Sequence, residues 1–415
     1  MPVSRGSVRH TLAEDMGNAL RSVLMPGRLA KRATADQKAV ASKKICQKFS
    51  FENVVLFPYA RSAFHAILST MNLPQKSEIL MTPITIGPML EVIKALGHKP
   101  IFVDIELETF CADLGDLKAK LRSKPACFLL TYLFGYVPDI ENIVAICRQA
   151  GTPLIEDISH NIGATYDGKF LGSFGTAAIY SASLLKYVDA YNGAFVATRD
   201  KKLADCLRVE VSRYKDPDPR RISKIIQTTL IWNICLRKIP FNLVVYPLLW
   251  IIKKLNREKF DQILGARIKF HLQNKLPGYY FEDIASIQSE MISTQLDKLE
   301  KLLSSRIDGA KLAAEAEQSI LGRGVTLSLS KKDSRRFHTF WQFIVPVQDL
   351  SKARDALFCR GVETGTTNLM NLAAKEKIKM PNAIKLKTQF IIIPIHKKLS
   401  SKTYKYIFKC LKNRE

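Results

Sequence analysis

Pro153-Leu-Ile-Glu-Asp157, a short apolar run that ends in two acids, decides the fold that we predict for this chain of 415 residues. A run this short and this apolar is typical of a strand that is buried on both faces of a parallel sheet. Ligands of such sheets bind at the carboxyl ends of the strands. We therefore expect Asp157 to lie at the ligand-binding edge of a mostly parallel sheet.

A second apolar run, residues 176–181, follows a stretch that glycines interrupt, and Lys186 stands five residues beyond Ser181. A carboxylate, a hydroxyl and a lysine that converge from adjacent strand ends are the groups that pyridoxal phosphate (PLP) requires. They bind the pyridine nitrogen, the phosphate and the reactive carbonyl carbon of the cofactor, respectively. A solvated lysine and a helix-capping aspartate give the same pattern, so spacing alone does not establish the cofactor.

Three segments, residues 156–175, 180–186 and 191–198, together resemble the core of the DegT/DnrJ/EryC1/StrS family of PLP-dependent sugar aminotransferases. The family pattern reads E-D-x-A-[QH]-x-x-G-A and then F-S-F-x-x-x-K-x-x-x-x-G-E-G-G. The resemblance implies the fold of the type I PLP-dependent transferases. This is an α/β large domain with a mostly parallel central sheet, followed by a smaller C-terminal α+β domain.

The resemblance also implies roles for individual residues. Asp157 aligns with the partner of the pyridine nitrogen, and His160 aligns with the residue near the ring hydroxyl of the cofactor. Ser181 aligns with a phosphate ligand and Lys186 with the Schiff-base lysine. On this alignment Lys186 is the catalytic residue.

Four further positions near the cofactor depart from the family pattern. Ala60 and Arg61 stand where the phosphate-binding turn usually has Gly and Thr, so Arg61 either adds a charge to the phosphate site or points to solvent. Ile86 stands where an aromatic ring usually stacks on the pyridine, which removes stacking worth about 0.5–1.5 kcal/mol. Asn192 replaces the signature glutamate, and we expect it to contact the substrate.

Phe281 and Asp283 replace an asparagine and an arginine of the family motif G-Y-N-Y-R-M, which reaches the phosphate of the partner subunit. The resemblance implies a homodimer with its active sites at the subunit boundary, and we expect the chain around Phe281 to cross to the partner. These departures keep a second hypothesis open, a PLP-fold protein with other or no catalytic activity. It would be a sugar dehydratase, which Lys186 disfavours because the dehydratases of the family have histidine there, or a membrane-surface scaffold.

The composition limits the class of protein. The net charge of +25 predicts an anionic partner, yet no nucleic-acid-binding motif accompanies it, so we predict no nucleic-acid partner. The eight cysteines form no C-x-x-C pair, which argues against a zinc site or a disulfide scaffold and favours a reducing compartment, the cytoplasm. No metal site is predicted. The N-terminus lacks the apolar region of a secretory signal.

We divide the chain into four parts: a basic N-terminal arm (1–50), a PLP-binding large domain (51–222), an apolar and basic helical insertion (223–275) and a C-terminal small domain (276–415). Apolar runs alternate with helical patterns in the large domain, as in βαβ units. Within the arm, residues 11–24 predict an amphipathic helix. The resemblance covers 53–208 and 278–415 and leaves the arm and the insertion uncovered.

The insertion is the least familiar part. Residues 225–252 are mostly apolar and include Trp232 and Trp250, but two basic residues and two prolines break them into pieces shorter than the roughly 20 residues of a membrane span. The pattern predicts a helical hairpin. It either packs against the body or the partner subunit, or it dips into a membrane interface, at the cytoplasmic face.

These observations predict a PLP-dependent aminotransferase. By the resemblance, it moves an amino group from an amino acid, L-glutamate, to a keto sugar carried by a nucleotide. Polysaccharide biosynthesis uses such aminosugars.

Overall fold

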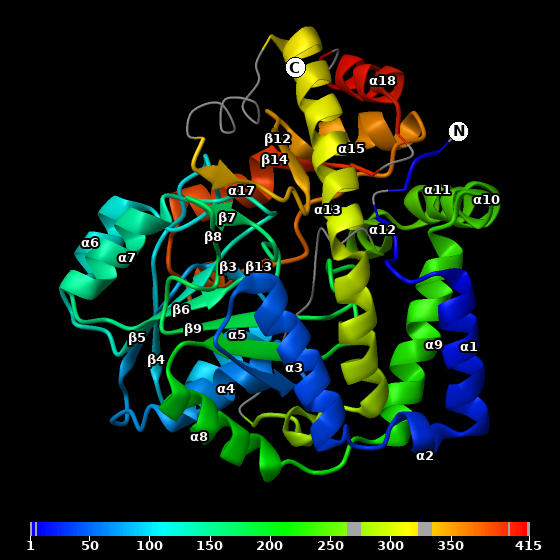
Figure 1. Ribbon diagram of the computed structural model, residues 1–415. Helices are drawn as coiled ribbons and strands as arrows, with labels where there is room; N and C mark the ends of the chain where they lie inside the picture. Colours follow the sequence, from blue (N-terminus) through cyan, green and yellow to red (C-terminus); the bar gives the residue numbers. More distant parts are fainter. Residues whose placement is uncertain (1, 5, 264–274, 323–333, 397–398, 413–415) are drawn as a thin grey trace.

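A seven-stranded sheet forms the centre of the computed structural model, which describes residues 2–4, 6–263, 275–322, 334–396 and 399–412 (Figure 1). The strand order is β1-β10-β9-β6-β5-β2-β4. The bounds are Asn53–Phe57 (β1), Glu78–Met81 (β2), Lys99–Phe102 (β4), Cys127–Thr131 (β5), Leu154–Asp157 (β6), Ala177–Ser181 (β9) and Ala194–Thr198 (β10). Within this sheet β10 runs opposite to the other six strands, which share one direction, so the predicted mostly parallel α/β sheet is confirmed.

The sheet is buried on both faces, as the apolar strands require. Side chains alternate along each strand, so Leu129 of β5 joins one hydrophobic cluster while Phe128 and Leu130 join the other. The first cluster includes residues of α4 (Ala60–Thr70), α5 (Gly87–Ala95) and α8 (Lys201–Ser212). The second includes residues of α3 (Ala35–Phe49), α6 (Leu114–Leu121) and α7 (Ile140–Gln149).

The strand register places three polar residues at one edge of the sheet. Thr131 at the end of β5 pairs with Asp157 at the end of β6, and Asp157 pairs with Ile179 of β9, two residues before Ser181. Because β5, β6 and β9 are parallel, their carboxyl ends meet. This is the edge where ligands bind in such sheets.

The C-terminal part is built on α13 (Ser286–Leu321), the long helix that crosses Figure 1 from bottom to top. One segment of α13 packs on α3, and another packs on α18 (Ser401–Lys412). A small sheet pairs β12 (Phe343–Pro346) with β14 (Phe390–Ile393), and the helices α15 (Leu350–Cys359), α16 (Leu372–Lys375) and α17 (Pro381–Gln389) complete this part. This arrangement agrees with the predicted α+β pattern.

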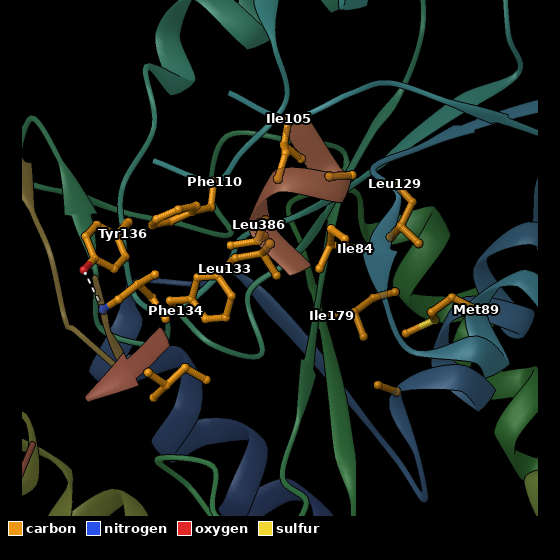
Figure 2. Packing of buried hydrophobic residues seen from close by; sticks show 14 of the residues in the cluster. Ile84, Met89, Ile105, Phe110, Leu129, Leu133, Phe134, Tyr136, Ile179 and Leu386 are labelled. Atoms are coloured by element: carbon orange, nitrogen blue, oxygen red, sulfur yellow. Dashed lines mark hydrogen bonds between the residues drawn. The ribbon is translucent and has the colours of Figure 1, made fainter. Parts of the chain in front are cut away.

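The two parts share one core. Figure 2 shows Leu386 of α17 beside Leu133 and Phe134, which follow β5. The ring of Phe110 makes edge contacts with Phe134, Tyr136 and Phe390. Short strands of the C-terminal part also pair with strands of the large part. The strand β11 (Arg336–Phe337) pairs with β7 (Thr165–Tyr166), which in turn pairs with β8 (Lys169–Phe170). The strand β13 (Met370–Asn371) pairs with β3 (Ile84–Thr85). The predicted domain boundaries stay a prediction, and residues 264–274 beside one of them lie outside the described residues.

The predicted N-terminal arm is folded into the body. The amphipathic helix expected over 11–24 is α1 (Leu12–Leu24), and it begins with a capping box between Thr11 and Glu14. A short helix, α2 (Pro26–Leu29), leads on to α3, whose Ile45 and Phe49 are buried against the sheet. The arm therefore contributes to the core of the protein.

The insertion consists of α9 (Pro219–Cys235), α10 (Lys238–Pro240), a π-helical turn η1 (Phe241–Val245), α11 (Tyr246–Leu255) and α12 (Arg257–Ile263). The predicted hairpin is wrong, because the chain bends by 70° between α9 and the segment 238–255 and does not turn back on itself. The physical reason is that the second arm packs elsewhere: Leu249, Phe260 and Phe358 form a separate small cluster. Within the described residues no single helix is long and apolar enough to cross a membrane, although this bent pair passes that test when its two arms are taken together.

Glu156 organises the loop between β8 and β9. Its buried carboxylate accepts hydrogen bonds from the Tyr132 hydroxyl at 2.7 Å and from the backbone N–H groups of Gly172, Phe174 and Gly175 at 2.8, 2.9 and 2.6 Å. An unsatisfied buried donor costs about 1–3 kcal/mol.

We expect Glu156→Ala to lower the free energy of unfolding by about 3 kcal/mol or more, because it leaves several of these donors without an acceptor. Urea unfolding monitored by circular dichroism measures the change. Glu315→Ala, at an exposed position on α13, is the control and should change stability by less than about 0.5 kcal/mol. Equal stability of the two variants would contradict this role of Glu156.

Candidate active site

A cavity of about 180 Å³ lies at the carboxyl edge of β5, β6 and β9. The structure brings together in its wall all eight residues that the sequence singled out: Ala60, Arg61, Ile86, Asp157, His160, Ser181, Lys186 and Asn192. They come from five separate segments of the chain. Their individual roles stay predictions, but their convergence on one cavity is a property of the fold.

Lys186 lies half-buried where this cavity meets a second one. Burial lowers the pKa of its amine to about 8, and the nearby Asp157 carboxylate opposes that shift. The Nζ atom lies 4.5 Å from the centroid of the Trp341 ring. Near pH 7.5 a larger fraction of this amine is neutral than of an ordinary lysine, and the neutral amine is the nucleophilic form.

Asp157 is a buried carboxylate, and it forms no ion pair with a basic side chain in the part of the chain that the structure describes. Its Oδ1 atom accepts a hydrogen bond from the backbone N–H of Ser159 at 3.0 Å. Burial raises the pKa of Asp157, against the opposing effects of the Ser159 hydrogen bonds and the Lys186 charge. A buried carboxylate without a cationic neighbour in contact is suited to a cationic ligand atom.

Another part of the cavity wall, at the start of α4, suits an anion. The helix α4 begins at Ala60, and its N-cap residue Tyr59 provides no side-chain cap, so the helix start lacks this common partner for its first N–H groups. Ser181 donates a hydrogen bond to Ser183 at 3.2 Å, and both hydroxyls line the cavity.

Arg61, the second residue of α4, also lines the cavity. Its guanidinium is held between aromatic rings, 4.1 Å from the centroid of Tyr59 and 4.5 Å from that of Tyr280. Its Nε atom is buried and has no hydrogen-bond partner among the described residues. The structure thus favours the first interpretation of Arg61, a charge directed at the site, over an arginine that points to solvent.

The second cavity has a volume of about 340 Å³ and shares Lys186, His160 and Leu369 with the first. The other walls come from segments that the sequence analysis did not connect with the site. They are Arg9 of the N-terminal arm, Trp232 and Leu236 at the end of α9, and Arg306, Trp341 and Glu363 of the C-terminal part.

His160 closes one side of this second cavity. Its ring stacks on Trp341 with the centroids 3.8 Å apart. Burial, helped by the Lys186 charge, lowers the pKa of His160 well below its usual value, so its ring is neutral. The sequence offered no signal for Trp341 or Arg306, because both are distant along the chain from the motif. Arg9 lies in the arm that the resemblance left uncovered.

The loop that carries Lys186 is tied to the N-terminal arm. Arg9 donates from Nε to the backbone oxygen of Lys186 at 3.3 Å, and Asp189 accepts from the backbone N–H of Leu185 at 2.9 Å. The His10 ring bridges the two segments, with Nδ1 2.8 Å from the Asp15 carboxylate and Nε2 2.7 Å from the backbone oxygen of Asp189. The position of Lys186 therefore depends on residues 9–15.

Phe281 and Asp283 lie against their own chain. The Phe281 ring contacts His65 and Tyr214, with centroids 5.0 and 5.8 Å apart. Asp283 is buried and forms an ion pair with Lys38 of α3 at 2.5 Å. Apolar packing and this ion pair explain why these residue types stand here, and the expected crossing to a partner subunit stays a prediction.

Comparisons with known proteins agree with this geometry. The sequence pattern of the DegT/DnrJ/EryC1/StrS aminotransferase family matches residues 14–218. The match begins inside α1, so the family region starts earlier than the resemblance noted above, which began at residue 53. It ends just before the insertion.

Two curated relatives match part of the chain. The chain is 36% identical over 148 residues to the pleiotropic regulatory protein of Geobacillus stearothermophilus. The matched region is 35% of this chain and 40% of the relative. The chain is also 30% identical over 170 residues to the GDP-perosamine synthase of Escherichia coli O157:H7. Here the matched region is 40% of this chain and 47% of the relative. The chain thus matches less than half the length of these relatives.

The sugar aminotransferase CalS13 from Micromonospora echinospora has a similar solved structure. It superposes with a TM-score of 0.70 over 99% of both chains at 19% sequence identity. At this identity the likeness concerns the fold, and it extends over the C-terminal part that the family pattern leaves out. The predicted type I transferase fold is confirmed.

The His10 contacts predict a pH-dependent stability. Burial by itself would lower the pKa of His10, but the Asp15 hydrogen bond and the Asp189 charge outweigh it and raise the pKa above 6.5. A raised histidine pKa stabilises the fold fully below the unfolded-state value of about 6.5, and this contribution is lost as pH rises through the folded-state value.

We therefore expect the wild-type protein to lose more stability in urea than His10→Gln as the pH rises above the unfolded-state value of about 6.5. Unfolding curves at several pH values give both slopes. If the variant keeps the full wild-type pH dependence, another group is responsible and His10 is not protonated in the folded protein.

Proposed function

Residues 14–218 make the chain a member of the DegT/DnrJ/EryC1/StrS aminotransferase family, and on that premise we propose that the protein is a PLP-dependent sugar aminotransferase. It moves an amino group from an amino acid, L-glutamate, to a keto sugar carried by a nucleotide. The observation that carries the proposal is the single cavity in which Lys186, Asp157 and the start of α4 converge.

The residues present fit the proposed cofactor. The cavity offers an amine of lowered pKa, a buried carboxylate without a cationic partner and an uncapped helix start beside Arg61. These match the carbonyl, the pyridine nitrogen and the phosphate of PLP. When bound, PLP supplies an electron sink that stabilises negative charge on the substrate carbon.

Lys186 attaches the cofactor and also serves as the proton carrier at the substrate carbon. With a pKa of about 8, its Nζ atom takes up and releases protons near neutral pH, which is the condition for efficient general acid–base catalysis. Asp157 holds a proton on the ring nitrogen by offering it an ionised oxygen. Ile86 lies in the cavity wall, where it would cover the ring of the bound cofactor by apolar contact alone.

The larger cavity is the proposed substrate site. It opens beside Lys186, and Arg9 and Arg306 bring two positive charges to its wall. Such charges suit the carboxylates of an amino-acid donor or the phosphates of a nucleotide. The stacked pair of His160 and Trp341 lines this cavity beside Lys186. The similarity to a GDP-perosamine synthase supports a nucleotide-linked sugar.

We place the enzyme in the cytoplasm as a homodimer. All eight cysteines are free thiols in the structure, in keeping with a reducing compartment. The proposed homodimer rests on the resemblance to the family. Asn192 lines the cavity, and we propose that it contacts the substrate. A protein with the PLP fold but without catalytic activity would not need Lys186 and Asp157 in the same cavity, so their convergence favours the enzyme.

Transfer of nitrogen from L-glutamate to a GDP-linked keto sugar tests the function. With PLP added, we expect the wild-type protein to form the amino sugar and 2-oxoglutarate, detected by mass spectrometry. Lys186→Ala should abolish the reaction, because it removes the amine that attaches the cofactor and carries the proton. Asp157→Ala should slow the reaction by roughly 100-fold or more, because it removes the charge that stabilises the protonated ring nitrogen. Lys169→Ala, at an exposed strand residue, is the control. Turnover by Lys186→Ala at the control rate would refute the assignment.

Arg61 should contribute to phosphate binding. A charge-assisted hydrogen bond contributes about 1.5–3 kcal/mol, so Arg61→Ala should weaken PLP binding by about tenfold or more in an absorbance titration. Pyridoxal, which lacks the phosphate, should bind equally to both proteins and is the matched control. If Arg61→Ala binds PLP as tightly as the wild type, Arg61 does not touch the phosphate.

A further inference from the structure

Helix α1 turns its polar side to the protein and its apolar side to solvent. Asp15, Asn18 and Ser22 are buried, whereas four apolar side chains at helical spacing are between 55% and 68% exposed: Met16, Leu20, Val23 and Leu24. A surface helix of a globular protein ordinarily has the opposite orientation. The apolar stripe of α1 therefore has no partner within the described part of the chain.

Hydrogen bonds fix this orientation. The Asp15 carboxylate accepts from the Tyr191 hydroxyl and from the Asn233 side-chain amide, both at 2.6 Å, and Ser22 lies 3.1 Å from Ser223 of α9. Rotating α1 to bury its apolar stripe would break these contacts and leave buried polar groups unpaired, at about 1–3 kcal/mol each. The exposure is thus built into the fold.

The insertion continues the apolar surface. Figure 1 shows α1 and α9 side by side, with α10 and α11 at the upper end of the pair. We call this region, α1 together with residues 219–255, the helical edge. Its exposed apolar side chains on the insertion are Ile231, Trp232, Ile234, Ile239, Leu243, Val244, Leu248, Ile251 and Leu255. Apolar exposure on this scale marks an interaction site.

The charges of the helical edge are mainly basic. Residues 219–255 contain seven basic and no acidic residues, and α1 contains Arg21 and two acids, of which Asp15 is buried and Glu14 is paired with Lys298. Some of these cations are paired with acids elsewhere, as Lys253 is with Asp355. Lys224, Arg237 and Lys238 are exposed and form no ion pair with any residue that the structure describes.

This charge pattern selects the occupant. A two-fold interface would place the helical edge against a copy of itself, so that like charges would face one another across apolar contacts. An anionic lipid surface complements both features, because apolar side chains enter the boundary of the acyl chains while cations meet the headgroups. The 70° bend between α9 and the segment 238–255 suits helices that lie on a bilayer.

We propose that the helical edge docks the protein on an anionic phospholipid bilayer, with the apolar stripe of α1 and the outer residues of α9–α11 in the interface. The docked edge adjoins the larger cavity, because Trp232 and Leu236 of α9 form part of its wall. The proposal does not depend on the catalytic assignment, since the binding it predicts needs neither cofactor nor substrate.

Vesicle flotation of the full chain tests the proposal. Wild-type protein should float with vesicles of equal parts phosphatidylglycerol and phosphatidylcholine at low salt, and much less at high salt or with phosphatidylcholine alone, because salt screens the cations. The affinity for anionic vesicles should fall by about tenfold or more in an apolar variant, which combines Leu20→Ser, Val23→Ser, Leu243→Ser and Leu248→Ser. A charge variant, Lys224→Gln with Arg237→Gln and Lys238→Gln, should also bind less, by roughly tenfold.

The control is Ile378→Ser with Ile384→Ser, which removes exposed apolar residues outside the helical edge and should float like the wild type. Urea unfolding verifies that each variant is folded, since all of the altered side chains are exposed. Wild-type protein that stays unbound with anionic vesicles at low salt would overturn the proposal. So would an apolar variant that floats normally but changes the dimer mass in light scattering, because the occupant would then be a second copy.

Discussion

Lys186 and Asp157 share one cavity, and the burial that brings them together is the constraint on which the rest of the structure depends. Removing charged groups from water is costly: burial raises the pKa of Asp157 and lowers that of Lys186, and the charge of each opposes the shift of the other. The parallel register of β5, β6 and β9 supplies the edge where they meet. The α4 helix start supplies the anion-binding part of the same cavity.

The insertion supports this pair from a distance. Asn233 of α9 donates to Asp15 of α1, and His10 connects Asp15 to Asp189, which in turn holds the backbone of Leu185 beside Lys186. A continuous chain of hydrogen bonds thus runs from the helical edge to the loop that carries the lysine. The same polar contacts force the apolar side of α1 outward, so the positioning of Lys186 and the exposed apolar stripe have one structural cause.

The sequence predicted those residues of the candidate site that lie at or just after the ends of strands. Asp157, Ser181 and Lys186 occupy positions that short apolar runs and their spacing define, so both the sheet edge and the cavity wall could be predicted. Arg306 and Trp341 could not, because only tertiary packing brings them to Lys186. Periodicity predicted α1 as amphipathic but not which side faces the protein, since that depends on the partners of Asp15 and Asn18. The bend after α9 likewise depends on the contacts of Leu249 with Phe358 and its neighbours.

Reductive trapping tests the central claim most directly. The protein is incubated with PLP, reduced with borohydride, digested and analysed by peptide mass spectrometry. The account predicts one phosphopyridoxyl group per chain, on the peptide that contains Lys186. The corresponding peptide of the Lys186→Ala variant, in which Asp157 is unchanged, should carry none. A wild-type protein whose Lys186 peptide remains unmodified, or whose label is spread evenly over surface lysines, would contradict the account.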